Sequence, residues 1–288
     1  MGLTTTSRYV LTLSCPDRVG IVHAVSGFLA SRGCNIVDSH QFGDDGTGMF
    51  FMRVAFETDD ETITLDRLVH GFAPVGGTAE MDWEIHDATQ RCRILVMVSK
   101  FGHCLNDLLY RTHIGALPVD IVGIVSNHRD FEDVATAAGL PFHHIPVTAA
   151  TKVDGEDRLA ELIRSGNVEL LVLARYMQVL SNTFCDTLPG RIINIHHSFL
   201  PGFKGAKPYH QAHDRGVKLI GATAHYVTSD LDEGPIIEQE VERVDHSLDA
   251  AELVAVGRDL ECQALSRAIR WHAEHRILLN GNRTVVFR

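Results

Sequence analysis

Apolar and polar positions in the first third of the chain follow the repeats of strands and helices. In chain order the pattern predicts a strand, a helix, two strands, a helix and a strand, at 9–14, 17–33, 35–42, 49–56, 65–71 and 79–86. Asp17 is the expected N-cap of the first helix, and Gly33 is its expected C-terminal stop. The stretch GDDGTG at 43–48 has the turn chemistry of a hairpin. The order β-α-β-β-α-β is that of the split βαβ, ferredoxin-like motif.

From Cys92 onward, short runs of β-branched residues and leucine alternate with helical segments. Strands are predicted at 93–99, 119–125, 168–173, 192–196, 221–227 and 236–241, with helices at 104–112, 131–139 and 156–164. Strands that alternate with helices imply a mostly parallel sheet, and continuous apolar strands fit a sheet that is covered on both faces. The polar stretch 86–91 is the expected linker. We therefore expect an α/β protein in which a ferredoxin-like domain, 1–86, precedes a Rossmann-like domain, 92–288.

Composition limits the classes of protein that the chain can represent. Its 288 residues suit about two domains, given ~100–200 residues per domain. The formal net charge of −11 disfavours a nucleic-acid surface, and no apolar run reaches the ~20 residues of a membrane helix. The six cysteines are scattered without a C-x-x-C pair, which predicts free thiols in a reducing compartment. We expect a cytoplasmic protein whose partners include neither nucleic acid nor membrane.

The strand predicted at 192–196 ends in an amide and an imidazole, although its other residues are isoleucines. Burying polar groups without partners is costly, so these two side chains need a reason to be there. Residues i and i+2 of a strand share a face, so Asn194 and His196 point the same way. In parallel α/β sheets, ligands bind beyond the carboxyl ends of the strands. The strand therefore predicts a ligand site that contains both residues.

An acidic turn, 228–235, separates the last two predicted strands and contains Asp232. An amide N–H can stabilise a developing oxyanion, and an imidazole can move a proton near neutral pH. A carboxylate can orient that imidazole or take a proton from an attacking water. Together the three groups would suit acyl chemistry. From spacing alone, a satisfied core histidine and a solvent-facing acidic turn stay open as the more ordinary interpretation.

Longer motifs add a family resemblance. The stretches at 173–180 (LARYMQVL), 194–201 (NIHHSFLP), 203–212 (FKGAKPYHQA), 221–227 (GATAHYV) and 231–236 (LDEGPI) carry it. They resemble the catalytic domain of enzymes that use 10-formyltetrahydrofolate, most closely the formyltetrahydrofolate deformylases. The stretch CPDRVGIV at 15–22, with Asn35-Ile36, is similar to an ACT domain. The resemblance covers nearly the whole chain.

The resemblance implies hydrolysis of 10-formyltetrahydrofolate to formate and tetrahydrofolate, which would balance the one-carbon pool and supply formate for purine synthesis. Asn194 would bind the formyl oxygen, His196 would stabilise the same charge or protonate N10, and Asp232 would hold the water and relay its proton. The implied folate-binding residues are Met177, Gln178, Val179, Leu180, His225, Val227 and Thr228. Lys204 and Lys207 could attract the glutamate tail of the folate. The folate is the substrate, and no cofactor is expected.

The acceptor of the formyl group is less certain from sequence. Related glycinamide ribonucleotide formyltransferases carry a Gly-Ser-Asn phosphate loop, whereas Gly102 here is followed by His103 and Cys104. A phosphate cradle depends on small residues and exposed donors at a helix N-terminus, so this change disfavours a phosphorylated amine and suits water. Lys100 and His103 could still bind an anion. An amine formyltransferase stays the alternative, and a catalytically inactive folate-binding regulator is a further one.

The resemblance also implies a regulatory site in the first domain. An amino-acid effector would bind Asp17, Arg18, Val19, Gly20 and Asn35. The other interpretation is that this domain only builds a homo-oligomer, a dimer or tetramer, because its sheet has edges that need cover. No metal site is expected, because His272 and His275 lack the H-E-x-x-H order of a zinc helix and the adjacent His143 and His144 would point apart.

Overall fold

The computed structural model describes residues 6–200 and 208–288. The chain divides into two compact units. The first contains residues 1–91, 274–280 and 285–288, and the second contains 92–273 and 281–284. The predicted linker lies at this division, because the last strand of the first unit ends at Asp87 and the next strand begins at Cys92.

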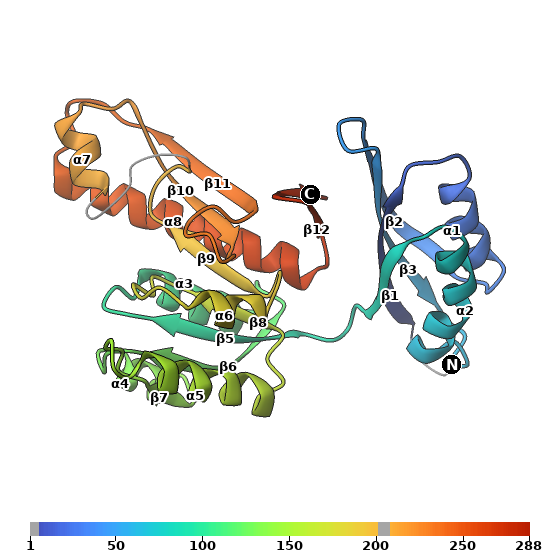
Figure 1. Ribbon diagram of the computed structural model, residues 1–288, viewed down its shortest axis with the longest axis horizontal. Coiled ribbons are helices and arrows are strands. Elements are labelled where there is room, and N and C mark those ends of the chain that lie inside the picture. The colour runs from blue at the N-terminus through green and yellow to red at the C-terminus, as the bar shows by residue number, and fades with distance from the viewer. Residues whose placement is uncertain (1–5, 201–207) are drawn as a thin grey trace. The chain divides into compact units, whose positions relative to one another are not determined.

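The first unit has the predicted ferredoxin-like order. Its elements are β1 (Ser7–Pro16), α1 (Ile21–Ala30), β2 (Asn35–Asp44), β3 (Met49–Thr58), α2 (Leu65–Thr78) and β4 (Asp82–Asp87). The four strands form an antiparallel sheet in the order β2-β3-β1-β4 (Figure 1). Alternate residues of the strands pack against both helices, and the core is centred on Leu11, Val54 and Phe72.

The start of helix α1 differs from the prediction. Its N-cap is Gly20, which adopts a left-handed backbone with φ 99, a conformation that a side chain would strain. Asp17 instead uses its backbone N–H to bond the carbonyl oxygen of Gly48, 2.8 Å away, so it continues the strand pairing rather than capping the helix. Helix α2 extends past the predicted end to Thr78, because Phe72 and Gly76 are buried in the same core.

The end of the chain was assigned to the wrong unit. Strands β12 (Ile277–Asn280) and β13 (Arg283–Val286) form a small sheet of their own, and most of this segment packs with the first unit. Leu278 and Phe287 form a core with Phe51, whose side chain lies on the face of β3 away from α1 and α2. The buried Arg53 donates hydrogen bonds to the carbonyl oxygen of Glu274. The predicted second domain, 92–288, is therefore too long at its C-terminal end.

The second unit is the predicted α/β sheet with antiparallel strands added at one edge. Its elements are β5 (Cys92–Val98), α3 (His103–His113), β6 (Val119–Ser126), α4 (Glu132–Ala137), β7 (Phe142–His144), α5 (Lys152–Ser165), β8 (Leu170–Leu173), α6 (Asn182–Asp186), β9 (Ile192–His196), α7 (Pro208–Asp214), β10 (Leu219–Tyr226), β11 (Ile236–Arg243) and α8 (Ala250–Ala273). Among the described residues the strand order is β11-β10-β9-β8-β5-β6-β7. Strands β5 to β9 are mutually parallel, whereas β10 runs antiparallel to both β9 and β11.

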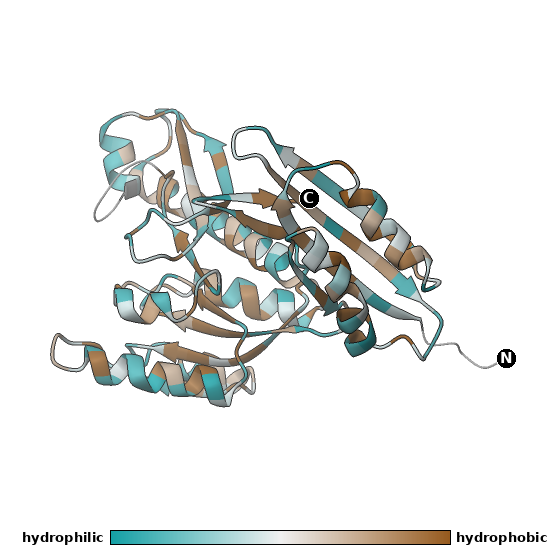
Figure 2. Ribbon diagram, turned by 45° about the vertical axis from the view of Figure 1, so that its right-hand side comes forward, coloured by the Kyte–Doolittle hydropathy of each residue, from teal (hydrophilic) through white to brown (hydrophobic). Residues whose placement is uncertain are grey.

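Helices cover both faces of this sheet (Figure 1). Helix α8 contacts β9, β10, β11 and α3 on one face. On the other face, α5 and α6 pack on Leu171, Leu173 and Ile192. The helices show bands of hydrophilic and hydrophobic residues, while the central strands are mostly hydrophobic, as their burial on both sides requires (Figure 2). No helix in the described ranges has both the length and the apolar character to cross a bilayer.

Candidate active site

A cavity of about 300 Å³ lies in the second unit beyond the carboxyl ends of β8 and β9. It is the position at which parallel sheets usually bind ligands. All of the predicted catalytic and folate-binding residues line it: Met177, Gln178, Val179, Leu180, Asn194, His196, His225, Val227, Thr228 and Asp232. They come from three places, the loop after β8, the end of β9, and the end of β10 with the turn that follows it.

Asn194 is oriented by a histidine on the neighbouring strand. Strands β9 and β10 are antiparallel, and their register places Asn194 opposite His225. The His225 Nδ1–H donates to the carbonyl oxygen of Tyr226 at 2.9 Å, so its Nε2 accepts from the Asn194 amide at 3.1 Å. Burial lowers the pKa of His225 and keeps the ring neutral. One N–H of the Asn194 amide is thus fixed on His225, and the second is available to a ligand in the cavity.

His196 and Asp232 form the other half of the site. His196 Nδ1 lies 3.3 Å from Asp232 Oδ1. This hydrogen bond from His196 is the main reason that the pKa of Asp232 lies below its usual value, despite the opposing effect of burial. His196 Nε2 is buried and has no hydrogen-bond partner among the described residues, although the ring lines the cavity. A buried nitrogen in this state is ready to bond a substrate.

The turn that carries Asp232 is held in a demanding conformation. Asp232 itself has φ 58, in the left-handed region, which costs a non-glycine residue roughly 1–3 kcal/mol. Two residues later, a Cβ on Gly234 would lie 1.8 Å from the carbonyl oxygen of Tyr226, so only glycine fits. The backbone N–H of Tyr226 bonds the carbonyl oxygen of Pro235 at 2.9 Å. These contacts fix the turn against β10 and bring Asp232 to His196.

Exposed apolar side chains form the rim of the cavity. Met177, Val179 and Leu231 are 51%, 57% and 65% exposed, although each lines the cavity. The backbone N–H of Met177 donates to the hydroxyl of Ser99 at 3.0 Å and so ties the 177–180 loop to the end of β5. Large apolar residues that stay exposed around a concave polar site are typical of a binding pocket for a partly aromatic ligand.

His197 and Arg175 are among the cavity residues outside the predicted set. Neighbouring residues of a strand face opposite sides, but the rings of His196 and His197 meet edge to face with their centres 5.2 Å apart, and both line the cavity. Strand β9 ends at His196, so the alternation of a strand no longer governs the next residue. Burial, and then the charges of Arg175 and His196, lower the pKa of His197 to about 4. Arg175 is the second such residue, and the only sequence signal for it is a charge inside the apolar run 173–180. Lys204 and Lys207 lie outside the described residues.

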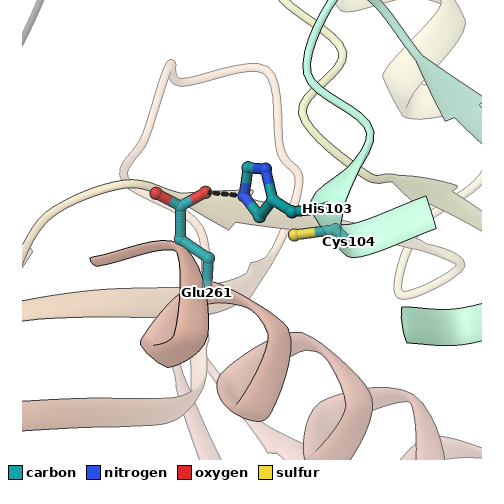
Figure 3. Close-up of side chains that lie close together, drawn as sticks. All are labelled: His103, Cys104 and Glu261. Carbon is teal, nitrogen blue, oxygen red and sulfur yellow. Dashed lines mark hydrogen bonds and ion pairs between the residues drawn. The ribbon is translucent and has the colours of Figure 1, made fainter. Parts of the chain in front are cut away.

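His103, Cys104 and Glu261 are the described group whose donor atoms are close enough to hold a metal ion (Figure 3). The Glu261 carboxylate is already engaged: it accepts from His103 Nε2 at 2.7 Å and from the Tyr209 hydroxyl at 3.0 Å, and Arg175 Nε lies 3.3 Å away. A guanidinium at this distance repels a cation, so the group is better explained as a buried ion-pair network. His272 lies near the end of α8, and His275 lies beyond the helix.

The residues expected to bind an effector do not converge within one chain. Asp17, Arg18, Val19 and Gly20 form the exposed loop after β1, and Arg18 donates to the carbonyl oxygen of Thr78 at 2.8 Å. Asn35 begins β2, where it lies opposite Glu57, which also faces Arg8 near the start of β1. The loop and Asn35 are thus at opposite ends of the sheet, about 25 Å apart at ~3.4 Å per residue. One small molecule cannot contact both in the same subunit.

Two family models match the chain in the order that the fold displays. The ACT domain model matches residues 9–65, and the formyl transferase model matches residues 92–269. The fold and the cavity thus define a formyl transferase-type enzyme domain joined to an ACT domain.

Relatives of similar length narrow this class. A formyltetrahydrofolate deformylase of Corynebacterium sp. (strain P-1) is 54% identical over 98% of both chains, and that of Bacillus subtilis (strain 168) is 44% identical over 96% of this chain and 93% of its own. The crystal structure of formyltetrahydrofolate deformylase from Burkholderia mallei ATCC 23344 covers 98% of this chain and 100% of its own at 54% identity, with a TM-score of 0.94. The chain belongs to the formyltetrahydrofolate deformylase family. By contrast, glycinamide ribonucleotide transformylase 1 from Symbiobacterium toebii covers 69% of the chain and 95% of its own at 31% identity, with a TM-score of 0.64.

Proposed function

We propose that the chain hydrolyses 10-formyltetrahydrofolate to formate and tetrahydrofolate in the cytoplasm. The observation that carries the proposal is the meeting of Asn194, His196 and Asp232 in one cavity with an apolar rim. An amide donor, an imidazole and a carboxylate are what the hydrolysis of a formamide requires. Full-length relatives named formyltetrahydrofolate deformylase support the same substrate.

Asn194 acts on the formyl oxygen. When water adds to the formyl carbon, the carbonyl electron pair moves to oxygen, and the N–H of Asn194 that His225 leaves unbound donates to that oxygen. Because His225 holds the other N–H, the amide presents a donor rather than its own carbonyl oxygen. Loss of one such donor typically lowers kcat by ~10²–10³.

Asp232 and His196 handle the protons. The low pKa of Asp232 keeps it ionised at neutral pH, so it can accept a hydrogen bond from the attacking water and relay its proton. The same carboxylate stabilises a protonated His196 through Nδ1, and His196 Nε2 can then donate to N10 as the bond from N10 to the formyl carbon breaks. Formate leaves with the oxygen of water, and N10 of tetrahydrofolate keeps the proton. No step requires a cofactor or a metal.

The direct test is to incubate the purified protein with 10-formyltetrahydrofolate in the absence of any amine. We expect tetrahydrofolate and formate in equal amounts, and Asp232→Asn is the matched control because it keeps the size of the side chain. If product appeared only after an amine acceptor was added, the protein would be a formyltransferase, and if none appeared under either condition it would be a folate-binding regulator.

The ACT domain supports a role in binding a small-molecule effector. We propose an amino acid as the effector and the exposed loop from Asp17 to Gly20 as its contact, because backbone N–H groups at a helix N-terminus favour a carboxylate. Since Asn35 lies at the other end of the sheet, its participation would require a second subunit. Strand β2 is an edge strand, which suits a homo-oligomer. A panel of amino acids that produced no thermal shift would remove the sensing role.

A further inference from the structure

We propose that Arg175, anchored by Glu261, closes the acceptor side of the formyl site, so that water and not an amine takes the formyl group. The inference rests on the proposed hydrolysis and concerns what selects its nucleophile. Arg175 lines the cavity with Asn194, His196 and His197, while Glu261 lies on α8 and is 1% exposed. Neither residue takes part in the steps described above.

The two faces of the sheet separate two possible routes to the formyl carbon. Tyr176, Leu180 and Cys185 line the cavity and also belong to the core on the α5 and α6 face, which places the folate side there. Helix α8 covers the other face beside β9, and α3 packs against α8. An amine acceptor that enters opposite the folate must come through the space between the ends of these helices and the catalytic residues.

Arg175 occupies that space because its backbone breaks the alternation of the strand. Leu171 and Leu173 face α5, and alternation alone would direct residue 175 to the same face. Instead Arg175 has φ 63, in the left-handed region, and its guanidinium pairs with Glu261 on α8. The guanidinium also lies 5.5 Å from the ring centre of Phe101, in the loop after β5. A strained backbone at a cavity wall indicates that this placement is held by its surroundings.

The Glu261 carboxylate fixes Arg175 and neutralises the positive charge that an anionic acceptor would need. Burial alone would raise the pKa of Glu261, but the hydrogen bond from His103 and the charge of Arg175 outweigh it, so the carboxylate stays ionised. Tyr209 supplies a further hydrogen bond. If Arg175 turned away, Glu261 would be a buried charge without its cation, which is strongly unfavourable. With the pair intact, the charge of Arg175 is balanced by Glu261 and is not available to attract a phosphate.

The loop in which transferases of the family bind phosphate also carries a side chain that is bonded to Glu261. His103, the first residue of α3, turns its ring to Glu261 rather than to a ligand (Figure 3). Gly102 is explained by packing, since a Cβ there would lie 2.2 Å from the ring of Phe131. The His103 side chain, which could otherwise bind an anion, is thus engaged by a carboxylate of the chain itself. Water, being small and neutral, is not excluded by any of these features.

The test is the partition of the formyl group in Arg175→Gly, a substitution that suits the positive φ at this position. Wild type and variant are incubated with 10-formyltetrahydrofolate and increasing concentrations of glycinamide or hydroxylamine, and formate, formylated amine and tetrahydrofolate are measured. In transfer, the amine nitrogen bonds the formyl carbon, the N10 bond breaks, and an amine proton passes to N10. We expect formate as the main product of the wild type, with a low ratio of formylated amine to formate. For the variant we expect a ratio of formylated amine to formate that rises with amine and exceeds that of the wild type by ~10-fold or more.

Controls separate this inference from the proposed function. Absence of tetrahydrofolate release by the wild type would reject the hydrolysis itself. Two results for folded Arg175→Gly, with an active wild type, would show that Arg175 does not exclude amines. One is the same ratio of formylated amine to formate as in the wild type, and the other is no release of tetrahydrofolate. Should Arg175→Gly fail to fold, the double variant Arg175→Gly/Glu261→Gln leaves no unpaired carboxylate and is judged by the same ratio. Arg175→Lys keeps bulk and charge, so it should retain formate as its main product.

Discussion

The link between His225 and Asn194 makes a quantitative prediction about catalysis. His225 is 2% exposed, and its Nε2 lies 3.1 Å from the Asn194 amide and 3.9 Å from Asp232 Oδ1. It therefore acts either through Asn194 or through Asp232. A double-mutant cycle with Asn194→Ala and His225→Ala distinguishes these two routes, because residues that act as a unit have non-additive effects.

The expected magnitudes follow from the contacts. Asn194→Ala removes the oxyanion donor and should lower kcat by ~10²–10³. His225→Ala removes one hydrogen bond that orients the amide, worth ~0.5–1.5 kcal/mol, so the population of the productive orientation should fall by up to about tenfold. Once Asn194 is alanine there is no amide left to orient. In that background His225→Ala should leave kcat unchanged within a factor of about two.

The measurement is single-turnover formate release at saturating folate, with thermal unfolding used to confirm that each variant is folded. His225→Gln is the matched control, since its carbonyl oxygen can accept from Asn194 and should recover part of the loss. If His225→Ala lowered kcat equally in both backgrounds, His225 would not act by orienting Asn194. Its effect would then be on Asp232.

Three further predictions test the turn, the base and the buried network. Asp232→Asn should keep the fold and folate binding but lower the rate of formate release by ~10²–10⁴, and unchanged turnover would remove Asp232 from the mechanism. Gly234→Ala should displace the turn, because its Cβ would meet the Tyr226 carbonyl oxygen, and lower kcat by ~10²-fold. Gly77→Ala, whose Cβ meets nothing within 4 Å, should leave kcat unchanged. The pKa of Glu261 is depressed in the folded chain, so its contribution to stability is present above the ordinary value of 4.5 and is lost as the pH falls through the folded pKa. Urea unfolding at a series of pH values should thus show that the free energy of unfolding falls more steeply toward acid pH in the wild type than in Glu261→Gln. Parallel plots of this free energy against pH would contradict an ionised Glu261.

The sequence was sufficient for the parts of the fold that depend on local periodicity. The two-domain order and the strand that carries Asn194 and His196 follow from alternation and apolar runs, because these strands are buried on both faces. The small sheet near Leu278 could not be assigned in this way. Its short strands pack on Phe51, which lies more than two hundred residues earlier in the chain, so no local pattern indicates the partner.

Within the site, the sequence located side chains that follow the alternation of a strand and missed those that depart from it. Asn194 and His196 obey the i, i+2 rule and were placed together. His197 lies one residue past the end of β9, and Arg175 adopts a left-handed backbone that is rare for residues other than glycine, asparagine and aspartate. The positions of both depend on tertiary contacts, such as the ion pair of Arg175 with Glu261 on a helix distant in sequence.

Arg175 and Asp232 share a physical logic. Each lies in a loop at the rim of the same cavity, Arg175 after β8 and Asp232 between β10 and β11. Each has a positive φ, and each is held by a side-chain partner, Glu261 for Arg175 and His196 for Asp232. A positive φ costs free energy that a glycine would avoid, yet glycine could supply neither charge. In the proposed mechanism these two strained residues have separate tasks: Asp232 directs the water to the formyl carbon, and Arg175 keeps other nucleophiles from reaching it. Hydrolysis, rather than transfer, is the outcome that we expect while both charges are held in place by their partners.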